Sequence, residues 1–146
     1  MGCVGELELC KGGPVVKDIQ ENFRQYLSIV YERISKDILW CYQDYIFPFQ
    51  KIGRWWNKNE EIDVVTLNEE ANKILFGEVK WSNRTVGVNI YQDLKRKSKE
   101  VIWGKDGKKE YYALFSRSGF TPAMKRLAKE EGVYLFEKNK LMSREA

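Results

Sequence analysis

Hydrophobic residues recur at helical spacing in the first third of the chain. Between Lys17 and about Tyr42, apolar side chains follow one another at intervals of three or four residues, at Ile19, Phe23, Leu27, Val30, Ile34 and Ile38. This spacing is typical of one face of an α-helix. The pattern therefore predicts a long amphipathic helix that covers one face of a sheet, in a segment that ends near Pro48.

Three short extended runs follow this helix. Residues 52–56, 61–67 and 73–81 are rich in apolar and β-branched side chains, and the segments 57–59 and 68–72 between them contain turn formers. The runs predict a meander of three strands. Because the third run is nearly all apolar, we expect it to be the central strand of the sheet.

The second half of the chain predicts two more helices and two more strands. A helix is marked by Tyr91, Leu94, Ser98 and Val101, and residues 111–116 form a strand. Thr121 caps a third helix with Pro122 at its first position, Gly132 ends it, and residues 133–136 form a last strand. The order α-βββ-α-β-α-β predicts an α/β fold with a central mixed sheet flanked by helices.

Composition agrees with a single globular domain. The chain has 146 residues, of which 43% are hydrophobic, which is enough to bury a core. We expect residues 1–16 to form a flexible leader and residues 17–146 to form one domain. No apolar run approaches the roughly 18 residues of a membrane span, and no signal-peptide pattern opens the chain, so we expect a cytoplasmic protein without membrane contact.

The residue types in the chain limit the kinds of functional site that it can form. The chain has no histidine, and its three cysteines form no CxxC pair, which disfavours a zinc site and His-based catalysis. Residues 1–72 carry 8 basic and 12 acidic side chains, whereas residues 73–146 carry 17 and 9. A basic half beside an acidic site suits a phosphodiester substrate. A Lys/Glu-rich surface of the kind found in heat-adapted proteins explains the same charges without function.

Charged residues stand inside two of the apolar strands, at Asp63, Glu78 and Lys80. Glu78 and Lys80 are two residues apart and therefore point to the same face. Such groups are costly to desolvate unless they pair or hold a metal. We interpret Asp63 and Glu78 as ligands of Mg²⁺ or Mn²⁺, with the Val79 carbonyl as a third oxygen. Lys80 would orient or deprotonate the attacking water. A buried Glu–Lys salt bridge and an exposed strand position for the aspartate are the simpler alternatives.

Residues of the first two helices are further candidates. Glu32 falls roughly opposite the stripe through Val30 and Ile34, which favours a solvated side chain over a supporting role at the site. Three polar residues of the second helix are candidate contacts with nucleic acid, namely Gln92, Lys95 and Lys97. We expect these lysines on an exposed basic face, and a merely solvated face is the alternative.

The chain also resembles a known family. The resemblance rests on five motifs, Tyr31-Glu32, Ile52-Gly53-Arg54-Trp55-Trp56, Glu61-Ile62-Asp63-Val64-Val65, Gly77-Glu78-Val79-Lys80-Trp81 and Phe115-Ser116-Arg117-Ser118-Gly119-Phe120-Thr121. Over about residues 17–136 the sequence is similar to the C-terminal domain of archaeal-type AAA ATPases. That domain in turn resembles the PD-(D/E)xK nucleases, including archaeal Holliday-junction resolvases.

The resemblance implies a restriction-endonuclease-like core and Mg²⁺-dependent phosphodiester hydrolysis. It maps Glu32 onto the acid of the first helix, Asp63 and Glu78 onto the metal ligands, and Lys80 onto the catalytic lysine. Ile62 stands where the superfamily's name has proline, and the sequence has no Walker motif. We therefore expect the chain to be a fragment, a split relative or a free-standing domain, with an AAA-type ATPase domain as an expected partner.

The sequence thus predicts a metal-dependent DNA endonuclease, with a homodimer as one arrangement that it leaves open. A non-catalytic DNA-binding or regulatory module is the first alternative. A partner-docking domain with an aromatic face around Trp55 and Trp56 is the second. The set of two acids and a lysine favours the enzyme, because a binding module has no need for buried acids that repel phosphate.

Overall fold

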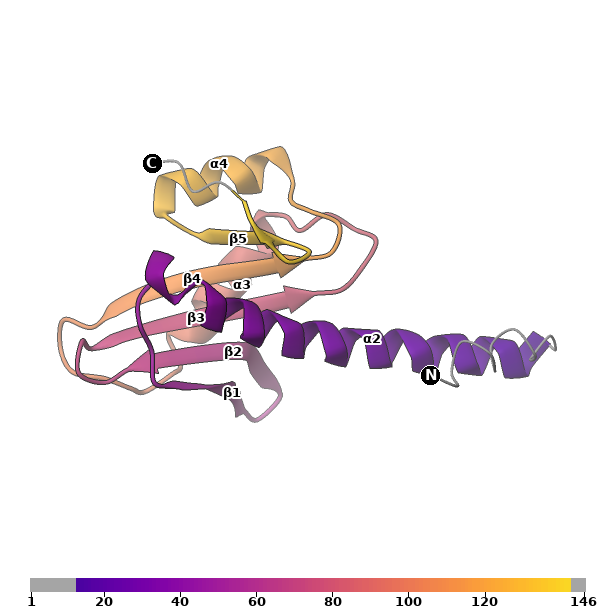
Figure 1. The fold of residues 1–146 in the computed structure, drawn as a ribbon, viewed down its shortest axis with the longest axis horizontal. Coiled ribbons are helices and arrows are strands. Elements are labelled where there is room, and N and C mark those ends of the chain that lie inside the picture. The colour runs from indigo at the N-terminus through magenta and orange to yellow at the C-terminus, as the bar shows by residue number, and fades with distance from the viewer. Residues whose placement is uncertain (1–12, 143–146) are drawn as a thin grey trace.

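The structure, a computed structural model, describes residues 13–142. Helix α2 (Gly13–Cys41) lies across one face of a sheet and continues beyond the edge of that sheet (Figure 1). A short 3-10 helix, η1 (Gln43–Tyr45), follows it. Helices α3 (Val88–Ser98) and α4 (Pro122–Glu131) pack on the opposite face. The fold is therefore an α/β fold with helices on both sides of the sheet, as the sequence predicts.

The sheet has six strands in chain order. They are β1 (Lys51–Asn57), β2 (Glu60–Asn68), β3 (Lys73–Lys80), β4 (Lys109–Ser116), β5 (Tyr134–Glu137) and β6 (Lys140–Leu141). The first three strands pair antiparallel, β3, β4 and β5 pair parallel, and β6 returns antiparallel to β5. The mixed sheet and the internal position of β3 are confirmed. The sequence pattern missed η1 and the two-residue strand β6.

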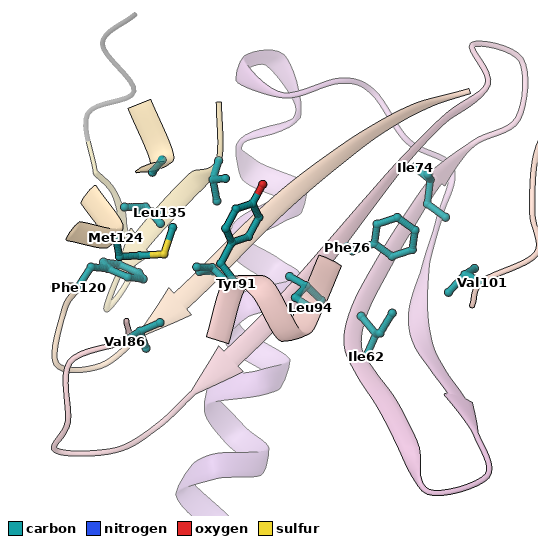
Figure 2. Close-up of a cluster of buried hydrophobic side chains, with 13 residues drawn as sticks. Ile62, Ile74, Phe76, Val86, Tyr91, Leu94, Val101, Phe120, Met124 and Leu135 are labelled. Carbon is teal, nitrogen blue, oxygen red and sulfur yellow. The ribbon is translucent and has the colours of Figure 1, made fainter. Parts of the chain in front are cut away.

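Two hydrophobic clusters cover the two faces of the sheet. Ile74 and Phe76 of β3 contribute to the cluster under α3 and α4, together with Tyr91, Leu94 and Met124 (Figure 2). Leu75 lies between them in sequence and contributes to the cluster under α2. Neighbouring side chains of a strand point to opposite faces. Burial on both faces explains why β3 is almost entirely apolar.

The ends of α4 agree with the predicted caps. The Thr121 hydroxyl accepts the backbone N–H of Met124 at 3.1 Å, and Pro122 occupies the first turn, where its missing N–H costs nothing. Gly132 ends the helix in the left-handed conformation with φ of 72°. A side chain there would be strained, so glycine is the residue that this cap requires.

The buried face of α2 differs from the predicted stripe. Tyr31, Ser35, Ile38 and Leu39 are buried, whereas Ile34 is 41% exposed. The Tyr31 hydroxyl donates to the Lys138 carbonyl, and Ser35 donates to the Tyr31 carbonyl one turn earlier, so these polar side chains are buried with partners. The inner face of α2 is thus rotated from the one that the aliphatic residues alone predict.

The helix also begins earlier than predicted. Residues 13–16, which we expected to belong to a flexible leader, form the first turn of α2, and residues 1–12 lie outside the described residues. Among residues 13–142, no helix combines the length and the apolar character needed to cross a lipid bilayer.

Candidate active site

A bulge in β2 places Asp63 where two strands separate. Gly53 pairs with Val65 and Trp55 pairs with Ile62, so two residues of β2 face the single residue between them in β1. Such an extra residue bends a strand and redirects its side chains. On the other side of β2, pairing with β3 ends at Val64. Asp63 therefore lies just beyond the last rung of the β2–β3 ladder.

The Asp63 carboxylate is held by the backbone of β3. Its Oδ2 accepts the N–H of Val79 at 2.9 Å. Burial, followed by the negative charge of Glu78, raises the pKa of Asp63 to about 6, although the Val79 hydrogen bond and the charge of Lys80 act in the opposite direction. Asp63 is thus a carboxylate whose negative charge lacks full compensation from the protein.

Glu78 is buried and paired with a lysine from α3. Only 6% of the residue is exposed, and its Oε1 accepts a hydrogen bond from Lys97 Nζ at 2.7 Å. Lys97 Nζ also donates to the Glu61 carbonyl oxygen at 2.8 Å and lies 3.8 Å from Asp93 Oδ2. Burial lowers the pKa of Lys97, but the hydrogen bond and charge of Glu78 outweigh burial, so the net shift of this pKa is upward. Glu78 and Lys97 therefore form a buried ion pair.

Lys80 lies near Asp63 and Glu78 but is not the ion-pair partner of Glu78. It is half-buried, and no carboxylate in the described part of the chain forms an ion pair with its Nζ. Its positive charge favours the ionised forms of Asp63 and Asp93 and so lowers the pKa of each. The predicted alternative, a salt bridge between Glu78 and Lys80, is wrong, because Lys97 is the partner of Glu78.

These groups meet in one open pocket of about 370 Å³. Its lining consists of Asn59, Glu60, Glu61, Asp63, Glu78, Val79, Lys80, Asp93, Arg96 and Lys97. Five of these side chains are acidic and three are basic. The pocket therefore has an excess of negative charge, which suits a cation better than an unaccompanied phosphate.

Two acids on the wall of the pocket are neutralised by Arg96. Its Nη2 lies 2.6 Å from Glu60 Oε1 and 2.8 Å from Asp93 Oδ1, and these hydrogen bonds lower the pKa of both acids. Sequence reasoning missed Glu60, Asp93 and Arg96. The signal that was available is the spacing of Asp93 and Lys97, four residues apart and thus one turn apart on one helix face.

Glu32 is connected to this site by its ion pair with Arg54. Its side chain is 19% exposed and hydrogen-bonds Arg54 Nη2, while Arg54 Nη1 lies 3.7 Å from Glu61 Oε2. Glu32, Glu61 and Asp63 all favour the charged guanidinium and so raise the pKa of Arg54. The expected solvated side chain is therefore wrong for Glu32, although the residue does not line the pocket.

The three candidate nucleic-acid contacts on α3 lie in different surroundings. Lys97 is 7% exposed, so its predicted place on an exposed basic face is wrong. Lys95 lies outside the pocket lining, where its Nζ pairs with Glu131 of α4 at 3.1 Å. Gln92 is exposed and also lies outside the pocket lining. Contact of Gln92 and Lys95 with nucleic acid stays a prediction.

The donor set fits a hard divalent cation. Carboxylate and carbonyl oxygens are the ligands that Mg²⁺ prefers, and Mg²⁺ retains several waters. Asp63 and Glu78 supply two carboxylates, and the Val79 carbonyl is adjacent. Among residues 13–142, no three Asp, Glu, His or Cys side chains gather into a group that could hold a metal. A cation here would therefore need the carbonyl and water as its remaining ligands.

Comparison with known proteins gives a family and two similar proteins. A protein-family model, DUF234, described as "Archaea bacterial proteins of unknown function", matches residues 4–102. Uncharacterized protein MJECL04 of Methanocaldococcus jannaschii is 42% identical over 108 residues, which cover 70% of this chain and 24% of that protein. The chain thus spans about a quarter of the length of this relative.

Among solved structures, a repair endonuclease from Pyrococcus abyssi is similar, with a TM-score of 0.44 and 20% sequence identity. The similar region covers 73% of this chain and 46% of that chain.

Proposed function

This chain belongs to the DUF234 family of "Archaea bacterial proteins of unknown function", and we propose that it is a metal-dependent nuclease that hydrolyses phosphodiester bonds in DNA. One observation carries the proposal. Asp63, Glu78 and Lys80 converge in a single open pocket at the place where β2 and β3 separate. Two adjacent acids, one with its pKa raised by burial and by the charge of the other, together with a lysine that forms no ion pair among residues 13–142, match the needs of such a reaction.

The proposed cofactor is Mg²⁺ or Mn²⁺, held by Asp63, Glu78 and the Val79 carbonyl. When bound, the cation would neutralise the two carboxylates and stabilise the negative charge that develops on the phosphate. The Val79 N–H keeps Asp63 in place, and Lys97 keeps Glu78 in place, so both ligands are oriented before the substrate arrives.

Lys80 acts on the substrate side of the pocket. Its ammonium group would orient the attacking water and stabilise the extra charge on the phosphate oxygens. Water adds to the phosphorus atom, one P–O ester bond breaks, and a proton reaches the leaving oxygen. The products are one phosphate-bearing end and one hydroxyl-bearing end. Glu32 supports this arrangement through Arg54, which bonds Glu32 and lies beside Glu61.

We further propose that the domain works beside other domains. Its match to only 24% of the Methanocaldococcus jannaschii protein is consistent with a nuclease module in a larger machine. The sequence resemblance points to an AAA-type ATPase domain as that partner and to a restriction-endonuclease-like core. A homodimer, Gln92 and Lys95 as DNA contacts, and a cytoplasmic location belong to the same proposal.

The test is cleavage of labelled single-stranded, duplex and four-way-junction DNA, and of matched RNA, with Mg²⁺, with Mn²⁺ and with chelator. Cutting should require the metal and should be lost in Asp63→Ala and Lys80→Ala. Lys73→Ala is the matched control, because Lys73 lies at the opposite end of the same strand, near the rings of Phe47 and Tyr111. It should cut like the wild type.

Other results would redirect the proposal. Salt-sensitive DNA binding without cutting would indicate a DNA-binding or regulatory module. Neither binding nor cutting would indicate a partner-docking domain. Cutting that survives both substitutions would show that the chemistry lies elsewhere.

A further inference from the structure

The ammonium group of Lys97 lies among oxygen atoms in the wall of the pocket. Its Nζ is 2.7 Å from Glu78 Oε1 and 2.8 Å from the Glu61 carbonyl oxygen, and Asp93 Oδ2 lies at 3.8 Å. Two carboxylates and one backbone carbonyl thus surround one positive charge. The same kinds of oxygen are the ligands of Mg²⁺ and Mn²⁺.

This lysine is fixed rather than solvated. The side chains of Lys97 and Glu78 are only 9% and 8% exposed, and Lys97 rises from the inner face of α3, which also buries Tyr91 and Leu94. An ion pair at the surface exchanges readily with water and salt, but a buried pair with two short hydrogen bonds does not. Lys97 is therefore a permanent cation on one side of Glu78.

Asp63 lies on another side of Glu78. The two carboxyl groups line the same pocket, next to the paired residues Val64 and Gly77 of β2 and β3. Lys97 hydrogen-bonds Oε1 of Glu78, whereas the Asp63 carboxylate accepts the Val79 N–H. Glu78 thus has the Lys97 ammonium group on one side and the Asp63 carboxylate on another.

We propose that Lys97 takes the place of a second divalent cation, so that each chain binds one Mg²⁺ or Mn²⁺ ion, at Asp63 and Glu78. This inference rests on the proposed function for the existence of that one ion. A second ion at the Glu61 carbonyl, Glu78 and Asp93 is excluded because the ammonium group hydrogen-bonds the first two, lies 3.8 Å from Asp93 Oδ2 and repels another cation at such short range. Lys97 is a positioning residue, since it acts through Glu78.

The experiment counts bound Mn²⁺ per chain by electron paramagnetic resonance of the free ion, without any substrate. Wild-type protein should bind one Mn²⁺, Asp63→Ala should lose it, and Lys97→Ala should bind two. Lys97→Arg keeps the positive charge and is the matched control, with one Mn²⁺ expected. The thermal midpoint of Lys97→Ala should also rise more with Mn²⁺ than that of the wild type, because an ion at the emptied position stabilises the folded state.

Loss of Lys97 leaves the buried Glu78 carboxylate without its partner, which destabilises the protein. Lys97→Gln retains a hydrogen-bond donor and is therefore measured as well. Both variants are refolded with Mn²⁺ present. Two ions in the wild type, or one ion in both Lys97→Ala and Lys97→Gln, would overturn the role of Lys97. No ion in the wild type but one in Lys97→Ala would uphold that role and contradict the proposed metal site. No ion in either protein would overturn both.

Discussion

Asp63 Oδ2 accepts the backbone N–H of Val79 at 2.9 Å, just beyond the last pair of the β2–β3 ladder. A side-chain oxygen here satisfies a backbone donor that the separating strands would otherwise leave without a partner. The bond also fixes the carboxylate in a buried position beside Glu78, and burial together with the charge of Glu78 raises the pKa of Asp63. The position of Asp63 thus follows from the β-bulge, and its electrostatic strain follows from its position.

Removing the charge of Asp63 should stabilise the protein at neutral pH. The pKa of Asp63 is about 6 in the folded state, against an ordinary value of 3.8. A folded-state pKa above the unfolded one means that ionisation costs stability, so this contribution is present below pH 3.8 and is lost as the pH rises through 6. Asp63→Asn, whose amide oxygen can still accept from Val79, should raise the free energy of unfolding by about 3 kcal/mol above pH 7.

Urea unfolding with chelator, at pH 4 and at pH 8, measures this effect. The gain from Asp63→Asn should be small at pH 4 and large at pH 8. Asp44→Asn, at an exposed aspartate of η1, is the control and should change little at either pH. Destabilisation by Asp63→Asn at pH 8 would mean that the ionised carboxylate, through its hydrogen bond with Val79, stabilises the protein by more than its burial costs.

Divalent metal binding should weaken in acid. A metal ligand must be deprotonated, so a proton on Asp63, with its pKa of about 6, competes with the ion. The affinity for Mn²⁺ should be flat above pH 7 and should fall about tenfold for each pH unit well below 6. Calorimetric titration between pH 5 and pH 8 measures the affinity, and equal affinity at the two extremes would contradict Asp63 as a ligand.

The order of helices and strands was predictable from sequence because local signals fixed it. Thr121 caps α4 with its hydroxyl group, and Pro122 and Gly132 mark the ends of the helix by their backbone conformations. The nearly unbroken apolar run of β3 follows from burial on both faces. The proximity of Asp63 and Glu78 was also predictable. The antiparallel pairing of β2 with β3 ends at Val64 and Gly77, and the two acids are the next residues along the strands.

The helical part of the site was not predictable in this way. A run of basic residues is usually a solvated face, but Lys97 stands three residues after the buried Leu94 and faces the sheet. Its burial depends on Glu78, which lies on strand β3. Glu32 was misplaced because the aliphatic stripe ignores Tyr31 and Ser35, which are buried with hydrogen bonds. Both errors concern polar side chains whose partners are set by tertiary structure.

Loss of Lys97 alone should be costly, and loss of the whole pair should be much less so. Lys97→Met leaves the buried Glu78 carboxylate without its counter-ion, which should lower the free energy of unfolding by about 3–5 kcal/mol in chelator. The double variant Lys97→Met/Glu78→Leu should recover most of the loss, because no buried charge remains. Guanidinium unfolding measures all three proteins.

Lys51→Met is the matched control for this comparison. Lys51 also pairs with a glutamate, Glu69, at 2.8 Å, but the two side chains are 66% and 60% exposed. An exposed pair of this kind contributes less than about 1 kcal/mol. If the double variant at the buried pair were as unstable as Lys97→Met alone, the lost stability would come from packing of the lysine stem rather than from charge.

Glu32 should influence cleavage only while Arg54 is present. Glu32 hydrogen-bonds Arg54, Arg54 lies 3.7 Å from Glu61, and Glu32 itself does not line the pocket. Glu32→Gln should therefore lower kcat/KM for DNA cleavage about tenfold, or about 1.4 kcal/mol. In an Arg54→Ala background the same substitution should have almost no further effect.

A double-mutant cycle on kcat/KM separates the two ways in which Glu32 could act. Coupling as large as the single effect means that Glu32 acts by holding the guanidinium. Additive effects would mean that Glu32 reaches the substrate or the metal by itself, in a conformation other than this one. Asp37→Asn, at an exposed acid further along α2, is the control and should leave both kcat/KM and the cycle unchanged.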